Sequence, residues 1–224
     1  MLIPIPRATL VLVDGDTVEE RNLLRQNFYP CDLGKNKAQA LAERLSRSYS
    51  RPVAYHPFHL DIRNPGLRAE LIVGCVDNPS GRKAIAQCCY DRAVWIDAGN
   101  GAHTGQVLVG NYRRDWGWET YWTTEKAYHL PLPSLQRPDL LTAVPVEELE
   151  ELSCAQGMLL GGQSPVINHA MASLVLTCVH QLLSGTLDWM AAYLDLQRGW
   201  LQYVPITQEA MERCFGQRTR RRRG

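Results

Sequence analysis

The sequence predicts an α/β fold, a Rossmann-like and mostly parallel sheet flanked by helices, with some antiparallel strands in the second half. Two observations predict it. Over the first hundred residues, apolar β-branched runs that stop at an aspartate alternate with helix-period segments. Near the end of the chain, two apolar runs are separated by a glycine turn, which is typical of an antiparallel pair.

The first strand and helix have the clearest signals. Residues 9–13 (TLVLV) form a continuous apolar run before the turn residues DGD, as expected of a strand buried on both faces. A helix-period segment follows over about residues 36–49. A strand followed by a helix is the first step of a chain in which strands and helices alternate.

Further strands are expected at residues 52–58, 71–76 and 93–96. Asn78 and Pro79 form the start signal of a helix, with asparagine as N-cap and proline at the first helical position. Together these elements predict the parallel part of the sheet.

The second half is expected to begin with a strand at residues 105–111 and an extended excursion or lid at 112–150. A long helix is predicted over residues 164–183, with Gly185 as its C-cap glycine. The last two strands are expected at residues 189–196 and 201–206.

Charge and composition exclude several classes of protein. The formal charge is +1, but five arginines lie in the last seven residues, so the body carries −4 and gives no reason to expect nucleic-acid binding. We expect residues 217–224 to be a disordered tail that makes at most a weak nucleic-acid contact. No run of about 18 uninterrupted apolar residues and no signal-peptide pattern is present, which predicts a cytoplasmic protein without a membrane partner.

The seven cysteines include no CxxC pair, so we expect reduced thiols and no zinc. Four of them fall in apolar segments and are interpreted as small core residues. These are Cys75, Cys88, Cys89 and Cys178.

Three aspartates follow predicted strands, at the edge of a parallel sheet where ligands bind. Asp14, Asp77 and Asp97 each occupy such a position. Asp14 stands where a dinucleotide-binding fold places the carboxylate that accepts hydrogen bonds from a ribose. The same position suits a turn residue, and the spacing alone favours neither interpretation.

Other candidate ligand-binding residues lie close by. Lys35 and Lys37 occur where a helix dipole disfavours cations, so a bound anion would account for them, as would a solvated surface position. Asn22 and Arg25 would face one side of a short helix and offer an amide and a guanidinium to one ligand. Alone, such a pair is more typical of a surface or a helix cap.

These residues occur in three consecutive stretches, VLVDGDTVEERNLLRQ, GKNK and IVGCVDN. In this arrangement the chain resembles the ThiF/MoeB superfamily, which includes the ubiquitin-activating enzymes. The resemblance implies binding of ATP and Mg²⁺, and adenylation of the C-terminal glycine carboxylate of a small ubiquitin-like protein. It also implies one ThiF-like domain over residues 1–216, with a nucleotide-binding half at about 1–98 and a partner-binding half at about 99–216.

The resemblance implies a role for each matching residue. Asp14 would contact the ribose, and Asp77 the magnesium ion. Asn22, Arg25 and Lys37 would contact the phosphates. Arg25 and Lys37 would also neutralise charge during the reaction, which makes them candidate catalytic residues.

Within the superfamily, the chain is most similar to the ThiF-related protein of the PRTRC cassette, a set of genes often carried on plasmids. The matching stretches include VWIDAGN, GAHTGQVLVG, LSCAQGMLL and DWMAAYLDLQRGWLQYVPI. Cys154 in SCAQG corresponds to a cysteine that some relatives use for a covalent acyl, persulfide or disulfide step. Gln26 completes the first motif without an assigned role.

One departure from the family affects the expected nucleotide site. The first strand, the GxGGxG loop and the first helix that normally precede Asp14 are not found, and the GxG at residues 99–101 opens no evident helix. We therefore expect the chain to begin at an internal methionine of a longer reading frame. As given, it is expected to bind ATP weakly or not at all.

Two other functions stay open at this point. A noncatalytic binding subunit would keep the fold without holding ATP productively. An NAD-dependent oxidoreductase would share the ribose carboxylate but would not explain Arg25, Lys37 and Asp77 together. A homodimer is also compatible with the sequence.

Overall fold

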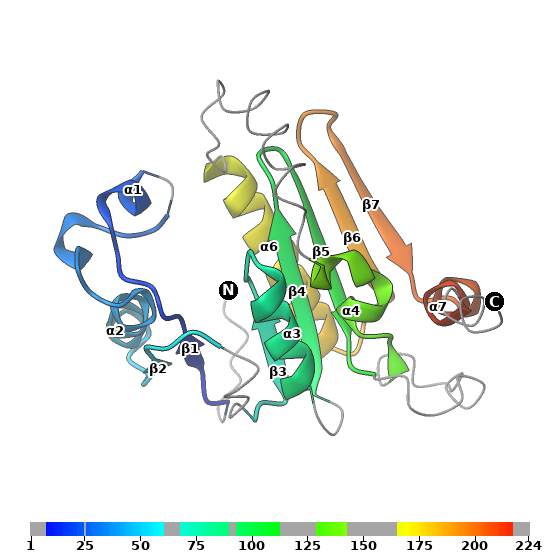
Figure 1. Ribbon diagram of the computed structural model, residues 1–224, viewed down its shortest axis with the longest axis horizontal. Helices are drawn as coiled ribbons and strands as arrows, with labels where there is room; N and C mark the ends of the chain where they lie inside the picture. The colour runs from blue at the N-terminus through cyan, green and yellow to red at the C-terminus, as the bar shows by residue number, and fades with distance from the viewer. Residues whose placement is uncertain are drawn as a thin grey trace. The chain divides into compact units, whose positions relative to one another are not determined.

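The computed structural model describes residues 8–24, 26–60, 68–89, 93–112, 129–142 and 165–216. The chain divides into two compact units, Met1–Asn64 and Pro65–Gly224, whose helices and strands are labelled in Figure 1. The fold is mixed α/β, with parallel and antiparallel pairing and flanking helices, as the sequence predicts. The single domain over residues 1–216 stays a prediction, and its expected division near residue 98 falls inside strand β4 (Val94–Asn100).

The first unit contains a small parallel sheet. Strand β1 (Val11–Val13) pairs in parallel with β2 (Ala54–His56), and helix α2 (Lys37–Tyr49) contacts both strands. Helix α1 (Glu20–Leu23) and the 3₁₀ helix η1 (Pro30–Asp32) precede α2. The strand–helix–strand order at 9–13, 36–49 and 52–58 is therefore confirmed.

Strand β1 is more exposed within its unit than its sequence predicts. Val11 is 38% exposed, and Leu12 and Val13 are half-buried rather than buried on both faces. Among the described residues β1 has one strand neighbour, β2, so its second edge forms no ladder. An apolar run thus identified the strand correctly but not its burial.

The second unit is built on a five-stranded sheet in the order β3-β4-β5-β6-β7. Strand β3 (Leu71–Gly74) pairs in parallel with β4, and the remaining pairs are antiparallel. The antiparallel part consists of β5 (Thr104–Gly110), β6 (Trp189–Asp195) and β7 (Trp200–Pro205). The predicted antiparallel strands of the second half are confirmed.

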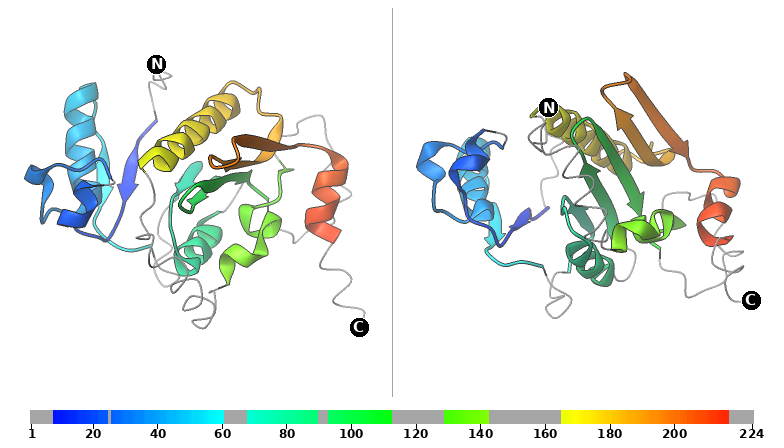
Figure 2. Two further views of the ribbon diagram at one scale, coloured as in Figure 1. Left: turned by 90° about the horizontal axis from the view of Figure 1, so that it is seen from above. Right: turned by 45° about the horizontal axis from the view of Figure 1, so that its top comes forward.

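Helices lie on both faces of this sheet, as the two views in Figure 2 show. One face carries α3 (Pro79–Cys88), α4 (Pro133–Gln136) and the 3₁₀ helix η4 (Pro138–Leu141). The opposite face is covered by α6 (Pro165–Leu183). Helix α7 (Gln208–Gly216) follows β7 and was not predicted from the sequence.

Helix α3 begins as its sequence predicts. The Asn78 side chain accepts a hydrogen bond from the backbone N–H of Gly81 at 2.7 Å, and Pro79 occupies the first turn. Gly185 after α6 and Gly199 between β6 and β7 both have positive φ, of 68° and 67°. The predicted turn residues are therefore confirmed at these positions.

Strand β4 is longer than expected, and this moves Asp97. The run at 93–96 predicts a strand that ends before Asp97, but β4 continues to Asn100 because it pairs with β5 as far as Gly105. Asp97 lies inside the ladder opposite Leu108 and is fully buried. Its expected place at a strand end was wrong.

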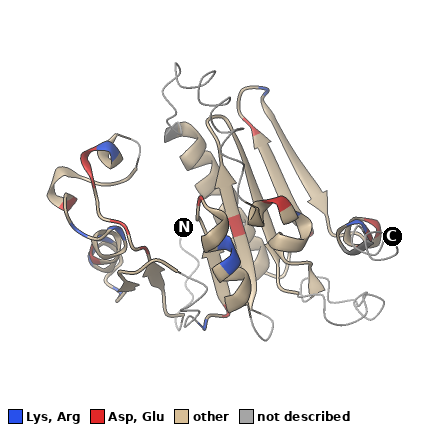
Figure 3. Cartoon of the chain, viewed as in Figure 1, with Lys and Arg blue, Asp and Glu red and all other residues tan. Residues whose placement is uncertain are grey.

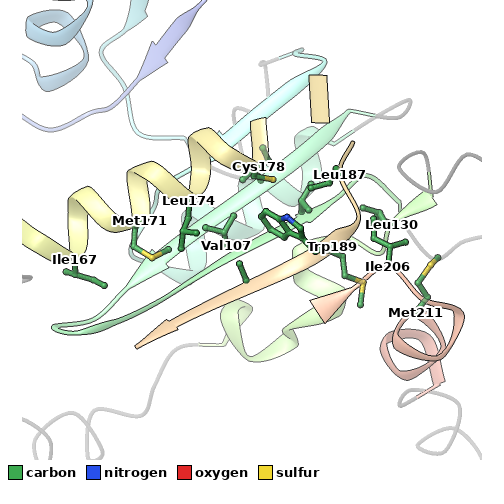
Figure 4. Close-up of a cluster of buried hydrophobic side chains, with 14 residues drawn as sticks. Val107, Leu130, Ile167, Met171, Leu174, Cys178, Leu187, Trp189, Ile206 and Met211 are labelled. Carbon is green, nitrogen blue, oxygen red and sulfur yellow. The ribbon is translucent and has the colours of Figure 1, made fainter. Parts of the chain in front are cut away.

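The main core lies between the sheet and α6 (Figure 4). Helix α6 contributes one side of this core through four buried residues, Ile167, Met171, Leu174 and Cys178. The sheet contributes the other side, including Val107 of β5 and Trp189 of β6, and Met211 of α7 also belongs to this core. Figure 3 shows that α6 carries no Lys, Arg, Asp or Glu.

By length and composition alone, α6 is also apolar enough to cross a membrane. Over Val166–Leu183 its mean hydropathy is 1.4, and 22% of this window is buried. The sequence shows no uninterrupted apolar run of that length, yet these 18 residues are apolar on average and contain no Lys, Arg, Asp or Glu. A helix that supplies a protein core has the same composition, and the absence of a membrane partner stays a prediction.

Two leucines on α6 allow a matched test of this core. Leu174 is buried, whereas Leu176 is 65% exposed. We expect Leu174→Ala to lower the free energy of unfolding by about 2–4 kcal/mol, because it leaves a cavity in the core. Leu176→Ala should change it by less than about 1 kcal/mol. Urea unfolding followed by circular dichroism measures both, and equal losses would contradict this packing.

Candidate functional site

The residues singled out in the sequence divide between the two units. Asp14, Asn22 and Lys37 belong to the first unit, and Asp77 belongs to the second. Arg25 and Cys154 lie outside the described residues, as do residues 113–128, residues 143–164 and the arginine tail. Each unit therefore presents its own group of candidate residues.

In the first unit, the turn after β1 is bound to the start of α2. The Asp14 carboxylate accepts a hydrogen bond from the backbone N–H of Asp16 at 2.8 Å, which is the turn role that the sequence left open. The Asn36 side-chain amide donates to the backbone carbonyls of Asp14 at 2.7 Å and of Asp16 at 3.0 Å. Asn36 also caps α2 by accepting from the backbone N–H of Gln39.

Lys37 is the first residue of α2, and its ammonium group is held in place. Its Nζ lies 2.8 Å from Oδ2 of Asp16, and its side chain is 14% exposed. The hydrogen bond from Lys37 lowers the pKa of the Asp16 carboxyl. Sequence reasoning identified Lys37 but missed Asp16, although the second aspartate of DGD was the available signal.

Asn22 has the capping role that the sequence also left open. Its side chain is buried, and its Oδ1 accepts the backbone N–H of Glu19 at 2.9 Å at the start of α1. Four residues later, Oε1 of Gln26 is buried without a hydrogen-bond partner among the described residues. An unsatisfied buried acceptor suits a ligand that donates a hydrogen bond.

In the second unit, a cavity of about 510 Å³ is lined by residues of the sheet, of α3 and of η4. Four segments line it. These are the segment from the end of β3 into α3, the β4–β5 hairpin, η4 with the residue before it, and the β6–β7 hairpin. Asp77 is exposed and lines it in the segment between β3, which ends at Gly74, and α3. Asp77 therefore follows the carboxyl end of β3 as predicted, although the strand ends two residues earlier than expected.

Arg82, which lines this cavity, belongs to a buried ion pair. Arg82 of α3 donates from Nε to both carboxylate oxygens of Asp97, each at 3.2 Å, and both side chains are almost entirely buried. Burial raises the pKa of Asp97 to about 6, and the neighbouring Arg82 partly offsets that rise. The sequence indicated Asp97 but gave no sign of Arg82 as its partner.

A second paired cation, Arg137, also lines this cavity. Arg137 donates to both oxygens of Asp139, at 2.9 and 2.6 Å, and from Nη1 to Oε1 of Gln106 at 3.0 Å. A hydrogen bond to Asp139 raises the pKa of Arg137, and one to Tyr193 contributes. Gln106 and Tyr193 are directly opposite each other in the β5–β6 ladder, so they face the same side of the sheet. Neither Arg137 nor Gln106 was expected as a site residue.

Cys75 also lines the cavity and is exposed, which corrects its interpretation as a core residue. The strand ends at Gly74, so Cys75 lies just beyond the ladder that was expected to bury it. Cys88, Cys89 and Cys178 are buried as predicted.

Within the described ranges, no group of three or more His, Cys, Asp or Glu side chains is placed to hold a metal ion. Asp77 offers one carboxylate, with Asn78 donating to it at 3.1 Å. One carboxylate fits Mg²⁺, which binds proteins through one or two carboxylates and is otherwise coordinated by substrate phosphates and water. The absence of zinc stays a prediction.

The chain belongs to the ThiF family, whose model matches residues 3–214. It is 32% identical over 108 residues to ubiquitin-like modifier-activating enzyme 5 of Dictyostelium discoideum, covering 40% of this chain and 28% of that protein. It is also 32% identical over 106 residues to the adenylyltransferase and sulfurtransferase uba4 of Neosartorya fischeri, covering 46% and 20%. The matches thus span less than a third of these relatives' length.

Solved structures share the fold. PaaA matches with a TM-score of 0.59 and 17% identity over 89% of this chain and 65% of that chain. E. coli MccB with ATP matches with a TM-score of 0.59 and 15% identity over 88% and 55%. The microcin C7 biosynthetic enzyme MccB in complex with N-formylated MccA matches with a TM-score of 0.59 and 17% identity over 88% and 57%. The Rossmann-like expectation is confirmed.

The buried carboxyl gives a prediction for pH dependence. Because the pKa of Asp97 is raised from 3.8 to about 6, its contribution to stability is present below about pH 4 and is lost as the pH rises through about 6. A carbon-13 NMR titration should show one aspartate carboxyl with a pKa near 6, missing in Asp97→Asn. Asp139→Asn is the control, since the pKa of Asp139 is lowered and its loss should leave the signal near 6 unchanged. A wild-type spectrum without that carboxyl would contradict the assignment.

Proposed function

We propose that this chain takes part in ATP-dependent adenylation of the C-terminal carboxylate of a small ubiquitin-like protein. The family match over residues 3–214 is the observation that carries the proposal. It is supported by the two relatives, which are named as a ubiquitin-like modifier-activating enzyme and an adenylyltransferase, and by MccB, whose structure was solved with ATP. In the reaction, a carboxylate oxygen attacks the α-phosphorus of ATP, an acyl–AMP bond forms, and pyrophosphate leaves.

The first unit supplies the groups that suit a nucleotide. Lys37 places a positive charge at the N-terminus of a 13-residue helix, where backbone N–H groups also favour an anion. Asp16 fixes the ammonium group at 2.8 Å and so determines where a phosphate would meet it. Asn22 and Arg25 are assigned to the phosphates and Asp14 to the ribose by their motif.

The second unit supplies the groups that suit the metal ion and the carboxylate. Asp77 would hold Mg²⁺, which on binding neutralises charge on the phosphates. The cavity beside it accepts an extended chain end rather than a folded domain, because its volume is that of a small-molecule site. The protein's contribution to such a reaction is positioning and charge neutralisation.

Exchange of pyrophosphate into ATP tests the adenylation step. With a ubiquitin-like protein that ends in glycine, we expect Lys37→Ala to lower the exchange rate about 100-fold or more, because it removes charge complementary to the transition state. Lys35→Ala is the matched control, since the Lys35 ammonium pairs with Glu43 at 3.1 Å, whereas that of Lys37 pairs with Asp16.

The same assay at millimolar ATP separates the alternatives. ATP binding without any exchange would favour the noncatalytic binding subunit. Exchange that is insensitive to both Lys37→Ala and Asp77→Ala would overturn the proposed site.

A thiol step is a separate proposal. Transfer would follow adenylation, with the Cys154 sulfur attacking the acyl carbon and AMP leaving, so a thioester replaces the acyl phosphate. We expect Cys154→Ala to retain pyrophosphate exchange and to lose any thiol-sensitive covalent adduct, which gel electrophoresis without reductant detects. Loss of exchange in a folded Cys154→Ala protein would show that the residue has a structural role instead.

A further inference from the structure

We propose that the space above Gly99 is a cradle for the reacting carboxylate, formed by Arg82, Gln106 and Gly99. The proposal rests on the proposed adenylation and adds the residues that would bind the acyl substrate. It makes Arg82 and Gln106 substrate-binding residues, a role that their sequence positions did not indicate.

Two N–H donors converge on this space. A Cβ atom built on Gly99 would lie 2.9 Å from Nη2 of Arg82 and 3.9 Å from Nε2 of Gln106. All three residues line the same cavity as Asp77. A carboxylate that occupies the space left by the missing side chain of Gly99 can therefore accept hydrogen bonds from both groups. One of its oxygens would accept from the Gln106 amide and the other from the Arg82 guanidinium.

The Arg82 guanidinium has N–H donors that Asp97 does not use. Its side chain is 9% exposed, and only Nε is used by Asp97. In the described part of the chain, its terminal nitrogens donate to no protein acceptor, and Arg82 lines the cavity. A ligand that accepts hydrogen bonds would satisfy them.

Gln106 is oriented by its neighbour. Arg137 donates to Oε1 of Gln106, so the amide presents its Nε2 hydrogens toward Gly99 rather than its oxygen. Gly99 and Gln106 are directly opposite each other in the β4–β5 ladder, and the absence of a side chain at Gly99 leaves Nε2 uncovered. Arg137 is thus a positioning residue for this donor.

The chemistry of the cradle favours a carboxylate over a phosphate. Arg82 is already paired with Asp97, and Arg137 with Asp139, so the site offers directed donors with little net positive charge. A singly charged carboxylate needs little counter-charge, whereas a triphosphate requires several cations. The cradle therefore suits the acyl substrate, and Lys37 of the first unit suits the nucleotide.

The test uses a minimal chain end as its probe. Acetylglycylglycine and its C-terminal amide differ only in the carboxylate, and both are titrated into nitrogen-15-labelled protein. We expect the acid, and not the amide, to shift the side-chain NH₂ signals of Gln106 and the backbone amide of Gly99. Equal shifts with both compounds would overturn the cradle.

Gln106→Glu replaces the donor by a carboxylate of the same size that still pairs with Arg137. It should raise the Kd for the acid about tenfold or more. Gln202→Glu is the matched control, because Gln202 lies opposite Tyr193 on the same sheet face but does not line the cavity. It should change the Kd by less than about twofold. Gly99→Ala, which places a methyl group against Arg82, should also abolish acid-specific binding while circular dichroism shows an intact fold.

The outcome separates this proposal from the proposed function. Acid-specific binding without pyrophosphate exchange under any condition would keep the cradle and reject adenylation. Exchange whose KM for the carboxylate substrate is unchanged by Gln106→Glu would keep adenylation and overturn the cradle.

Discussion

The buried ion pair between Arg82 and Asp97 is the interaction on which the second unit depends. Removing two charges from water costs several kcal/mol per ion, and this cost is offset only when the geometry is good. Both Asp97 oxygens accept from the same Arg82 nitrogen at 3.2 Å, so α3 must begin at a fixed place above β4. The Asn78 cap and Pro79 determine where α3 begins. The buried pair of Arg82 and Asp97 therefore depends on a signal that is local in the sequence.

Two glycines allow this close approach. A Cβ on Gly74 of β3 would lie 2.7 Å from Cδ1 of Ile85, and one on Gly99 would lie 2.9 Å from Arg82. A side chain at Gly74 would displace the end of the Ile85 side chain, and one at Gly99 would displace the Arg82 guanidinium that pairs with Asp97. The absence of a side chain at Gly99 makes room for Arg82, and it also leaves the space that forms the candidate site.

Sequence reasoning predicted elements better than contacts. The positions of the strands before Asp14 and Asp77, the Asn78 cap and the turn glycines were correct because they depend on neighbours within a few residues, although β3 ends at Gly74 and not at residue 76. It failed for the length of β4, which is determined by pairing with β5, and for the burial of β1, which depends on what covers the strand. The pairing of Arg82 with Asp97, fifteen residues apart, has no local signature.

The candidate residues follow the same division. Lys37 and Asp77 were found because their motifs are contiguous, whereas Gln106 and Arg137 are brought together across 31 residues by the sheet and η4. Charge in the cavity is balanced pair by pair, and Asp77 adds a further negative group. Attraction of a carboxylate must then come from aligned donors rather than from a positive field, since Coulomb attraction falls when each cation already has a partner. A site of this kind selects its ligand by the directions of its hydrogen-bond donors. Its specificity therefore depends on the position of α3, which carries Arg82, relative to the sheet.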